Sequence, residues 1–357
     1  MATGQRGAER KLRFAHIGLE LDGAWWSVKA ALEDPDLQFV GIAEPKHFLL
    51  DLARRRADPL GLVLPLRDGI RLFTDFVQML DQVKPDIANV YSPLSEHLAV
   101  VRECARRKIH CWVQKPAALT GPDAREMERL ARDSGIVLVV SDFQLARDAV
   151  LEVARRVERG DVGDVTKVFS IHGFSGQKDH GCSRWYKDYF YDVARHGGGA
   201  LMDQTTYAIA RVMYILGSPL SVFALTPTIK TEPQPGGPVE DDALVILEYP
   251  RAQGICAGSW AYPNYGIDDI QVFGLKGSIY LMDGTIYERP SMADMSQPRT
   301  EYQRVDIPPA HVPTMKDYVL RGLPLARLHS PGFMARVNEV VDAAYESART
   351  RRAIPLA

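Results

Sequence analysis

The chain has 357 residues, and its 43 lysines and arginines against 45 aspartates and glutamates give a formal net charge of −2. Apolar residues make up 46% and charged residues 25%, which is typical of a globular protein. The length suits two domains, the charge balance argues against a nucleic-acid binder, and the absence of any run of about 18 apolar residues argues against a membrane span.

The N-terminal residues and the cysteines bear on where the protein works. Residues 1–11 lack the apolar core of a secretory signal and are expected to form a short mobile tail. The cysteines fit neither a CxxC motif nor a disulfide framework; they are Cys104, Cys111, Cys182 and Cys256. These features predict a protein of the reducing cytoplasm.

The first third of the chain alternates buried strands with amphipathic helices. Short apolar runs predict strands at 12–17, 38–43, 87–91, 110–113 and 136–140. Helical spacing predicts helices at 24–32, 73–83, 97–107 and 122–134. Alternation with short connections is typical of a doubly wound parallel sheet of the Rossmann type, which we expect over residues 12–142.

After Asp142 the pattern changes to successive strands, which predicts an α+β domain with a largely antiparallel open sheet over residues 143–357. We expect strands at 166–171, 222–226, 243–248, 255–260, 270–273 and 278–282, and helices at 147–159, 200–216 and 331–349. A loop is expected at 230–238 and irregular structure at 283–309. The last helix is expected to pack back toward the first domain.

The open apolar face of such a sheet is usually covered by a partner. We therefore expect a homodimer or homotetramer formed through the C-terminal sheet. We expect no nucleic-acid and no membrane partner.

The loop between the first strand and the first helix resembles a dinucleotide-binding turn. Gly18 and Gly23 match the first and third glycines of a GxGxxG fingerprint, whereas Glu20 stands in place of the second. Glu20 and Asp22 place two carboxylates where a diphosphate should lie. The candidate cofactor contacts here are Gly18, Leu19, Glu20 and Gly23. A plain strand–turn–helix connection would leave the same pattern.

Glu44 ends the second predicted strand, 21 residues after Gly23. An acidic residue at this position accepts hydrogen bonds from the adenosine ribose and repels a 2′-phosphate, so it favours NAD over NADP. Alternatively, Glu44 only caps the strand next to Pro45.

Further candidate residues follow the third and fourth predicted strands. Ser92, Pro93 and His97 come after the third strand, and Gln114 and Lys115 come after the fourth. Ligands of parallel sheets bind at this edge, and a lysine in a partly dry site can act in acid–base chemistry. Position alone also permits a plain helix entry and a solvated lysine.

A triple glycine at 197–199 precedes Asp203 and Tyr207, which share one face of the predicted helix. The glycines allow a ligand to approach the helix start closely. Tyr207 can donate a proton if a nearby cation stabilises its phenolate, or it can be a buried tyrosine satisfied by Asp203.

The sequence Gln114-Lys115-Pro116 resembles the EKP signature of the Gfo/Idh/MocA family of oxidoreductases. The other motifs follow in that family's order, and the resemblance spans about residues 12–356. It implies that Lys115 is the catalytic lysine beside the nicotinamide and that Asp203 orients the substrate. It also implies that Tyr207 replaces the acid–base histidine found in many members.

The same resemblance implies that a tryptophan-bearing segment before the triple glycine closes over the substrate. Arg184, Trp185 and His196 are therefore candidate substrate contacts, together with Lys115, Asp203 and Tyr207. An interdomain loop whose tryptophan only packs is the alternative. The spacings of His172, His180, Cys182 and His196 match no standard zinc pattern, so no metal site is expected.

The resemblance implies an NAD(P)-dependent dehydrogenase or reductase acting on a CH–OH group, with NAD favoured over NADP by Glu44. It would transfer a hydride between nicotinamide and a secondary alcohol or ketone of a sugar, sugar acid or cyclitol. Three departures from the family pattern are Glu20, Gln114 in place of glutamate, and Thr205-Thr206 in place of a small or apolar pair. They leave open a sensor-like member with weak or no NAD binding. An NAD-assisted hydrolase or lyase is a further alternative.

Overall fold

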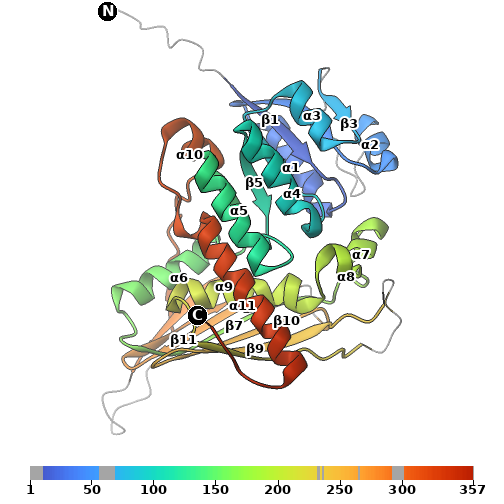
Figure 1. Ribbon diagram of the computed structural model, residues 1–357. Coiled ribbons are helices and arrows are strands. Elements are labelled where there is room, and N and C mark those ends of the chain that lie inside the picture. The colour runs from blue at the N-terminus through green and yellow to red at the C-terminus, as the bar shows by residue number, and fades with distance from the viewer. Residues whose placement is uncertain are drawn as a thin grey trace, which may run out of the picture.

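The computed structural model describes residues 11–55, 69–230, 234, 237–263, 266–291 and 301–356. Nearly all of the tail expected at 1–11, and parts of the segments 230–238 and 283–309, lie outside the described residues. Figure 1 shows two lobes, each built on its own β-sheet. The predicted combination of a parallel and a largely antiparallel sheet is confirmed. In the described part of the chain, no helix is both long and apolar enough to cross a membrane.

The first lobe contains a six-stranded sheet in the order β3-β2-β1-β4-β5-β6. All neighbouring strands run parallel, as in a doubly wound fold. The strands are β1 (Leu12–Ile17), β2 (Leu37–Ala43), β3 (Arg71–Phe73), β4 (Ile87–Val90), β5 (His110–Gln114) and β6 (Leu138–Ser141). Their buried valines, isoleucines and leucines explain the near-continuous apolar runs in the sequence.

Helices cover this sheet. They are α1 (Asp22–Glu33), α2 (His47–Arg54), α3 (Phe76–Val83), α4 (His97–Arg107) and α5 (Gly121–Ser134). The helix predicted at 73–83 begins later because Phe73 ends β3 and Asp75 caps α3 by accepting a hydrogen bond from the Gln78 N–H at 2.6 Å. Neither α2 nor β3 was predicted, since both are too short for a clear periodic pattern.

The second lobe contains a nine-stranded sheet in the order β14-β13-β12-β11-β7-β10-β9-β8-β15. All its pairs are antiparallel except β7 with β10. The strands are β7 (Val165–Gly173), β8 (Ser221–Leu225), β9 (Asp242–Glu248), β10 (Gln253–Ser259), β11 (Ile267–Gly274), β12 (Gly277–Met282), β13 (Thr285–Pro290), β14 (Gln303–Val305) and β15 (Ile354–Pro355).

The expectation of irregular structure at 283–309 is wrong, because β13 and β14 extend the sheet there. Asp283 and Gly284 join β12 to β13 with positive φ angles of 47° and 73°. An Asp-Gly pair between two strands is a strong hairpin signal. The hairpin between β12 and β13 was therefore predictable from the sequence.

The helices of the second half are α6 (Asp148–Arg159), α7 (Arg184–Phe190), α8 (Val193–His196), α9 (Thr206–Leu216), α10 (Met315–Arg321) and α11 (Pro331–Thr350). Short 3-10 turns lie at Leu94–Glu96 and Arg327–His329. The single helix expected at 200–216 instead opens with a π-helical turn at Leu201–Thr205. There the Thr205 hydroxyl donates to the Ala200 carbonyl and the Thr206 hydroxyl to the Met202 carbonyl, at 3.2 and 2.7 Å.

Helix α11 runs between the lobes and contacts α5 and β8 (Figure 1). Arg125 of α5 donates to both carboxylate oxygens of Glu339 at 2.5 and 3.0 Å. Asn338 accepts from the Ala117 N–H at 3.2 Å and donates to the Ala118 carbonyl at 2.7 Å. The end of the chain thus contacts the loop that follows β5.

Candidate active site

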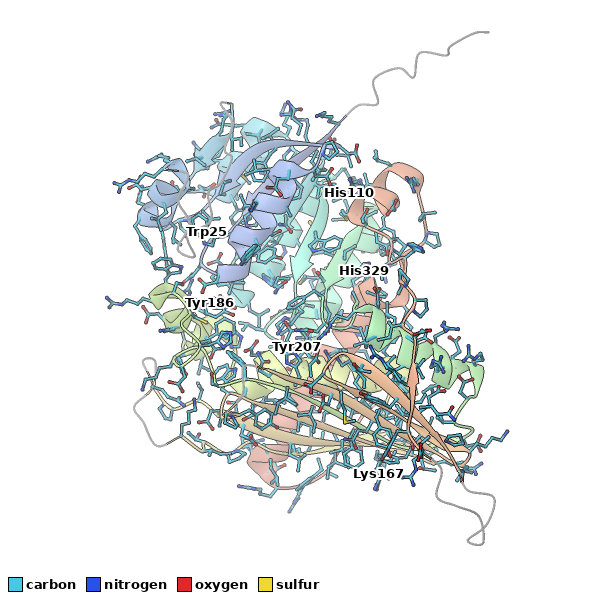
Figure 2. The ribbon with its side chains drawn as sticks, turned by 180° about the vertical axis from the view of Figure 1, so that it is seen from behind. Trp25, His110, Lys167, Tyr186, Tyr207 and His329 are labelled. Carbon is cyan, nitrogen blue, oxygen red and sulfur yellow. The ribbon has the colours of Figure 1, made fainter. Side chains whose placement is uncertain are left out.

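A cavity of about 640 Å³ lies between the two lobes. From the first lobe it is lined by Leu21, Gly23, Tyr91, Gln114, Lys115 and Pro116, and from the second lobe by His172, Tyr186, His196, Asp203 and Tyr207 among others. Figure 2 shows Tyr186 and Tyr207 at this junction. The cavity therefore lies at the carboxyl ends of β4 and β5, where parallel sheets bind ligands.

The three predicted catalytic residues meet in this cavity. Lys115, directly after β5, donates from Nζ to the Asp203 backbone carbonyl at 2.7 Å and to Asp203 Oδ1 at 3.1 Å. The same Nζ lies 3.7 Å from the centre of the Tyr207 ring. All three residues are buried, with exposed fractions of 5 to 7%. The tertiary structure thus brings together residues 88 positions apart in the chain.

Asp203 is held as a fixed carboxylate. Its Oδ2 accepts hydrogen bonds from Gln204 Nε2 at 2.6 Å, Trp260 Nε1 at 2.9 Å and Gln177 Nε2 at 3.2 Å. Burial raises the pKa of Asp203, but Lys115 and these donors outweigh burial and leave the pKa below its ordinary value. Both carboxylate oxygens of Asp203 therefore have hydrogen-bond partners, and one of these partners is the Lys115 ammonium.

Tyr207 keeps its proton. Burial raises its pKa well above the ordinary value, and the negative charges of Asp142 and Asp203 raise it further. Its ring packs against His172 at a centroid distance of 4.5 Å and against Phe143 at 5.8 Å. Such a hydroxyl is protonated at neutral pH and can donate a hydrogen bond.

His172, on β7, is a site residue that sequence reasoning considered only for metal binding. Its Nδ1 lies 2.6 Å from Gln204 Oε1, and Gln204 Nε2 donates to Asp203, so the amide oxygen faces the histidine. His172 therefore carries its proton on Nδ1 and joins a hydrogen-bonded chain that ends at Lys115. Burial, with Arg211 and Lys115 nearby, lowers the pKa of His172 to about 3 and keeps the ring neutral.

His196 lines the cavity, as its predicted role as a substrate contact requires. Its Nδ1 lies 2.6 Å from the Gly198 carbonyl, which only accepts, so the proton is on Nδ1 and Nε2 is left as an acceptor. Burial lowers the pKa of His196 to about 4. A neutral imidazole of this kind suits a substrate hydroxyl.

A charged cluster that the sequence did not reveal lies behind His172. Arg211, fully buried on α9, pairs with Asp268, which also pairs with Arg147. His172 Nε2 lies 4.0 Å from Asp268 Oδ1. Burial lowers the pKa of Arg211 to about 10, although Asp142 opposes that shift. Arg147 and Asp268 line the cavity and give this end of it a polar wall.

The turn after β1 has the shape that a dinucleotide needs. Gly18 has a φ of 91°, and a Cβ there would lie 2.5 Å from the backbone of Tyr91 and Ser92, so only glycine fits. Leu21 and Gly23, at the N-terminus of α1, line the cavity. Beside Gly18, the hydroxyl of Ser92 is buried with no partner among the described residues. The residues present therefore fit a diphosphate and an adjoining ribose.

Other predicted cofactor residues support the turn from behind. Glu44 is 2% exposed, and its two oxygens accept from the Leu19 and Lys46 backbone N–H groups at 2.7 and 2.8 Å. Burial raises the pKa of Glu44. The Glu44 carboxylate therefore holds the turn in place through these two hydrogen bonds, in addition to any contact with a ribose.

His97 and Pro93 also lie outside the cavity lining. The two ring nitrogens of His97 lie 3.0 Å from the Ala117 carbonyl and 3.1 Å from the Ser92 carbonyl. Burial lowers the pKa of His97. The ring thus joins the loop after β4 to the loop after β5. Of the predicted cofactor residues, Gly23, Gln114 and Lys115 line the cavity.

Arg184 and Trp185 do not line the cavity, and their role as substrate contacts stays a prediction. The Arg184 side chain is 91% exposed and faces Asp188 at 3.8 Å. Trp185 packs against Phe48, with ring centres 5.3 Å apart, and against the apolar cluster around Trp25 in the first lobe. The helical turn of α7 points Tyr186 into the cavity instead.

Two sequence models of one family match the chain. The first, described as an oxidoreductase family with an NAD-binding Rossmann fold, matches residues 56–142, and the second, described as the GFO/IDH/MocA C-terminal domain, matches residues 150–280. The chain is also 23% identical over 277 residues to scyllo-inositol 2-dehydrogenase (NAD(+)) of Bacillus subtilis, which covers 76% of this chain and 74% of that protein.

Solved structures share the whole fold. An aldose-aldose oxidoreductase from Caulobacter crescentus, solved with glycerol, has a TM-score of 0.78 at 22% identity and covers 97% of this chain and 100% of its own. A levoglucosan dehydrogenase, solved with NADH and levoglucosan, has a TM-score of 0.76 at 19% identity and covers 97% of this chain and 99% of its own. At these identities the likeness shows the fold.

Proposed function

Because the chain belongs to the Gfo/Idh/MocA family of oxidoreductases, we propose that it is an NAD-dependent dehydrogenase or reductase. Its substrate would be a secondary alcohol or ketone of a sugar, sugar acid or cyclitol. The observation that carries the proposal is the meeting of Lys115, Asp203 and Tyr207 in the cavity between the lobes.

The residues that would hold the cofactor form one edge of the cavity. The Gly18–Gly23 turn and the N-terminus of α1 suit the diphosphate, while Gln114 and Lys115 adjoin the nicotinamide end. Bound NAD supplies the hydride acceptor or donor. NAD is proposed over NADP because Glu44 directly follows β2, and one relative named above carries NAD(+) in its name.

The chain's own residues would handle the substrate oxygen and its proton. The Lys115 ammonium, fixed by Asp203, attracts the developing negative charge on that oxygen. In the reducing direction Tyr207 donates its hydroxyl proton to the carbonyl oxygen, and the nearby ammonium stabilises the phenolate left behind. In the oxidising direction the same proton would move from the substrate hydroxyl to Tyr207 in the fraction of the enzyme that carries Tyr207 as a phenolate. Nε2 of His196 would accept a hydrogen bond from a neighbouring substrate hydroxyl.

Lys115→Met tests this assignment. We expect the variant to lose about a hundredfold or more of kcat/KM for NAD-linked oxidation of the best substrate found in a panel of sugars, sugar acids and cyclitols. NADH fluorescence titration would show that the variant still binds cofactor.

Lys29→Met is the matched control, because Lys29 is partly exposed on α1, outside the cavity lining, and pairs with Glu33 at 4.0 Å. It should keep wild-type kinetics. A Lys115→Met enzyme as fast as wild type across the panel would refute the role of the lysine.

A further inference from the structure

Glu20, which departs from the glycine of the fingerprint, is not an unpaired charge in the phosphate turn. It is 2% exposed, and its carboxylate pairs with Lys46, just after β2, and with Arg195 of α8 in the second lobe. Arg195 donates from both terminal nitrogens, one of them at 2.8 Å from Glu20 Oε1. The pair of carboxylate and guanidinium is bidentate and spans 175 residues of sequence.

The segment 183–196, which contains α7 and α8, contacts the first lobe at this turn and beside it. Ser183 donates from its backbone N–H and its hydroxyl to Asp22 at 3.0 and 2.6 Å. The Leu94 N–H donates to the Tyr189 hydroxyl at 3.1 Å. Trp185 packs against the first lobe beside Phe48. The two carboxylates in the turn, Glu20 and Asp22, thus both hold this segment.

The two cations of this cluster suit an anion with more oxygens than one carboxylate. Both pair with the single carboxylate of Glu20, while the carboxylates of Glu96 and Glu44 lie close enough to interact with the same groups. The side chains of Lys46 and Arg195 keep exposed fractions of 32 and 29%, whereas that of Glu20 keeps 3%. A guanidinium that binds a carboxylate bidentately has the same fork that binds phosphate oxygens.

The cluster also lies beside the position expected for the cofactor's diphosphate. Leu21 directly follows Glu20, and it lines the cavity with Gly23 at the N-terminus of α1. A diphosphate there would bring two negative charges toward Lys46 and Arg195, against the single charge of Glu20.

On the premise of the proposed NAD-dependent function, we propose that Arg195 and Lys46 are ligands of the cofactor's diphosphate and that Glu20 is their internal competitor. Before the cofactor binds, Glu20 holds Arg195 and therefore the segment 183–196 on the turn. When the cofactor binds, the diphosphate replaces the Glu20 carboxylate on both cations. The second lobe thereby contributes directly to cofactor binding.

If this exchange occurs, substitutions at the two ends of the Glu20–Arg195 ion pair should shift the affinity for NADH in opposite directions. Glu20→Gln removes the competitor and should tighten NADH binding about tenfold. Arg195→Met removes a ligand and leaves an anion in the turn, so it should weaken NADH binding about tenfold or more. Lys46→Met leaves Arg195 paired with Glu20 and should weaken binding severalfold. In the cofactor-free protein both Glu20→Gln and Arg195→Met should lower Tm.

The experiment is a fluorescence titration of each purified full-length variant with NADH, with Tm measured in the absence of cofactor. Glu33→Gln, on the surface of α1, and Arg321→Met, exposed on α10, are the matched controls and should bind like wild type. Opposite shifts for Glu20→Gln and Arg195→Met support the exchange.

Two other results overturn it and are distinguishable. If wild type binds NADH but Glu20→Gln binds equally or more weakly, or if Lys46→Met binds like wild type, the cluster is structural and the proposed NAD-dependent function stands. If neither wild type nor Glu20→Gln binds NADH at millimolar concentration, the proposed function fails together with the exchange.

Discussion

At the scale of single residues, His16 shows how the first sheet supports the phosphate turn. Its Nε2 lies 2.8 Å from the Gly18 carbonyl, and its Nδ1 lies 3.0 Å from Asn89 Nδ2. The neutral ring therefore donates to the turn with one nitrogen and accepts from Asn89 with the other. Burial lowers the pKa of His16 from 6.5 to about 4, although the Gly18 carbonyl opposes that shift.

This environment predicts an acid-sensitive contribution to stability. Because the folded pKa lies below the unfolded one, the unfolded chain takes up the proton first as the pH falls below 6.5. We expect His16 to make unfolding easier by about 2 kcal/mol between pH 6.5 and about pH 5. Denaturant unfolding at several pH values should show a shallower pH slope for His16→Gln than for wild type.

His47→Gln, at an exposed position, should keep the wild-type slope. An unchanged slope in His16→Gln would mean that the buried ring does not remain neutral in the folded state.

At the scale of elements, α11 holds the loop that carries Lys115. Asn338 is 1% exposed, and it satisfies the N–H of Ala117 and the carbonyl of Ala118, two and three residues after Lys115. Both backbone groups would otherwise be buried without partners. Helix α11 thus fixes the position of the loop that carries Lys115, the proposed catalytic lysine, in the first lobe.

Asn338→Leu should therefore destabilise the protein by about 2–4 kcal/mol, because it leaves two buried backbone groups unpaired. Glu346→Leu, exposed on the same helix, changes the helix propensity little and is the control. Chemical denaturation measures both. A loss below about 0.5 kcal/mol for Asn338→Leu would show that water or a rearranged loop replaces the two bonds.

At the scale of the whole molecule, the second sheet has one face covered and one open. Helices α6, α9 and α11 lie on the side of the inward residues, such as Val168, Val245 and Val272. The alternate residues form an apolar outer face: Phe169, Ile171, Phe223, Leu244, Ile246, Ile255, Phe273 and Tyr280. Figure 2 shows Lys167, also on an outward position of β7, on the side of the sheet away from the first lobe.

We propose that this outer face is the contact between two copies of the chain, since a contiguous apolar sheet face is rarely left exposed to water. The double variant Phe169→Glu and Ile246→Glu should halve the mass that sedimentation equilibrium measures. Leu323→Glu, at a 41% exposed position outside the sheet, should leave the mass unchanged. A monomeric wild-type protein would refute this interface.

Local patterns in the sequence determined the elements and the first members of the site. Period-2 and period-3.6 patterns identified most strands and helices, and short or weakly periodic ones such as β3, α2 and β13 were missed. Lys115 follows a parallel strand, and the spacing of Asp203 and Tyr207 predicts that both face the same side of a helix, so their convergence followed from general rules of such folds. The order of the motifs also led to the family, which the domain matches confirm.

Only the tertiary structure decided the partners of individual side chains. In the tertiary structure Trp185 packs against the first lobe, the Glu44 carboxylate accepts hydrogen bonds from backbone N–H groups, and Glu20 pairs with Arg195 from the other lobe. The tertiary structure also brought His172 and Asn338 to the site. The physical reason is that periodicity specifies which face of an element is buried, whereas a salt bridge or hydrogen bond across 100 or more residues depends on how the elements pack.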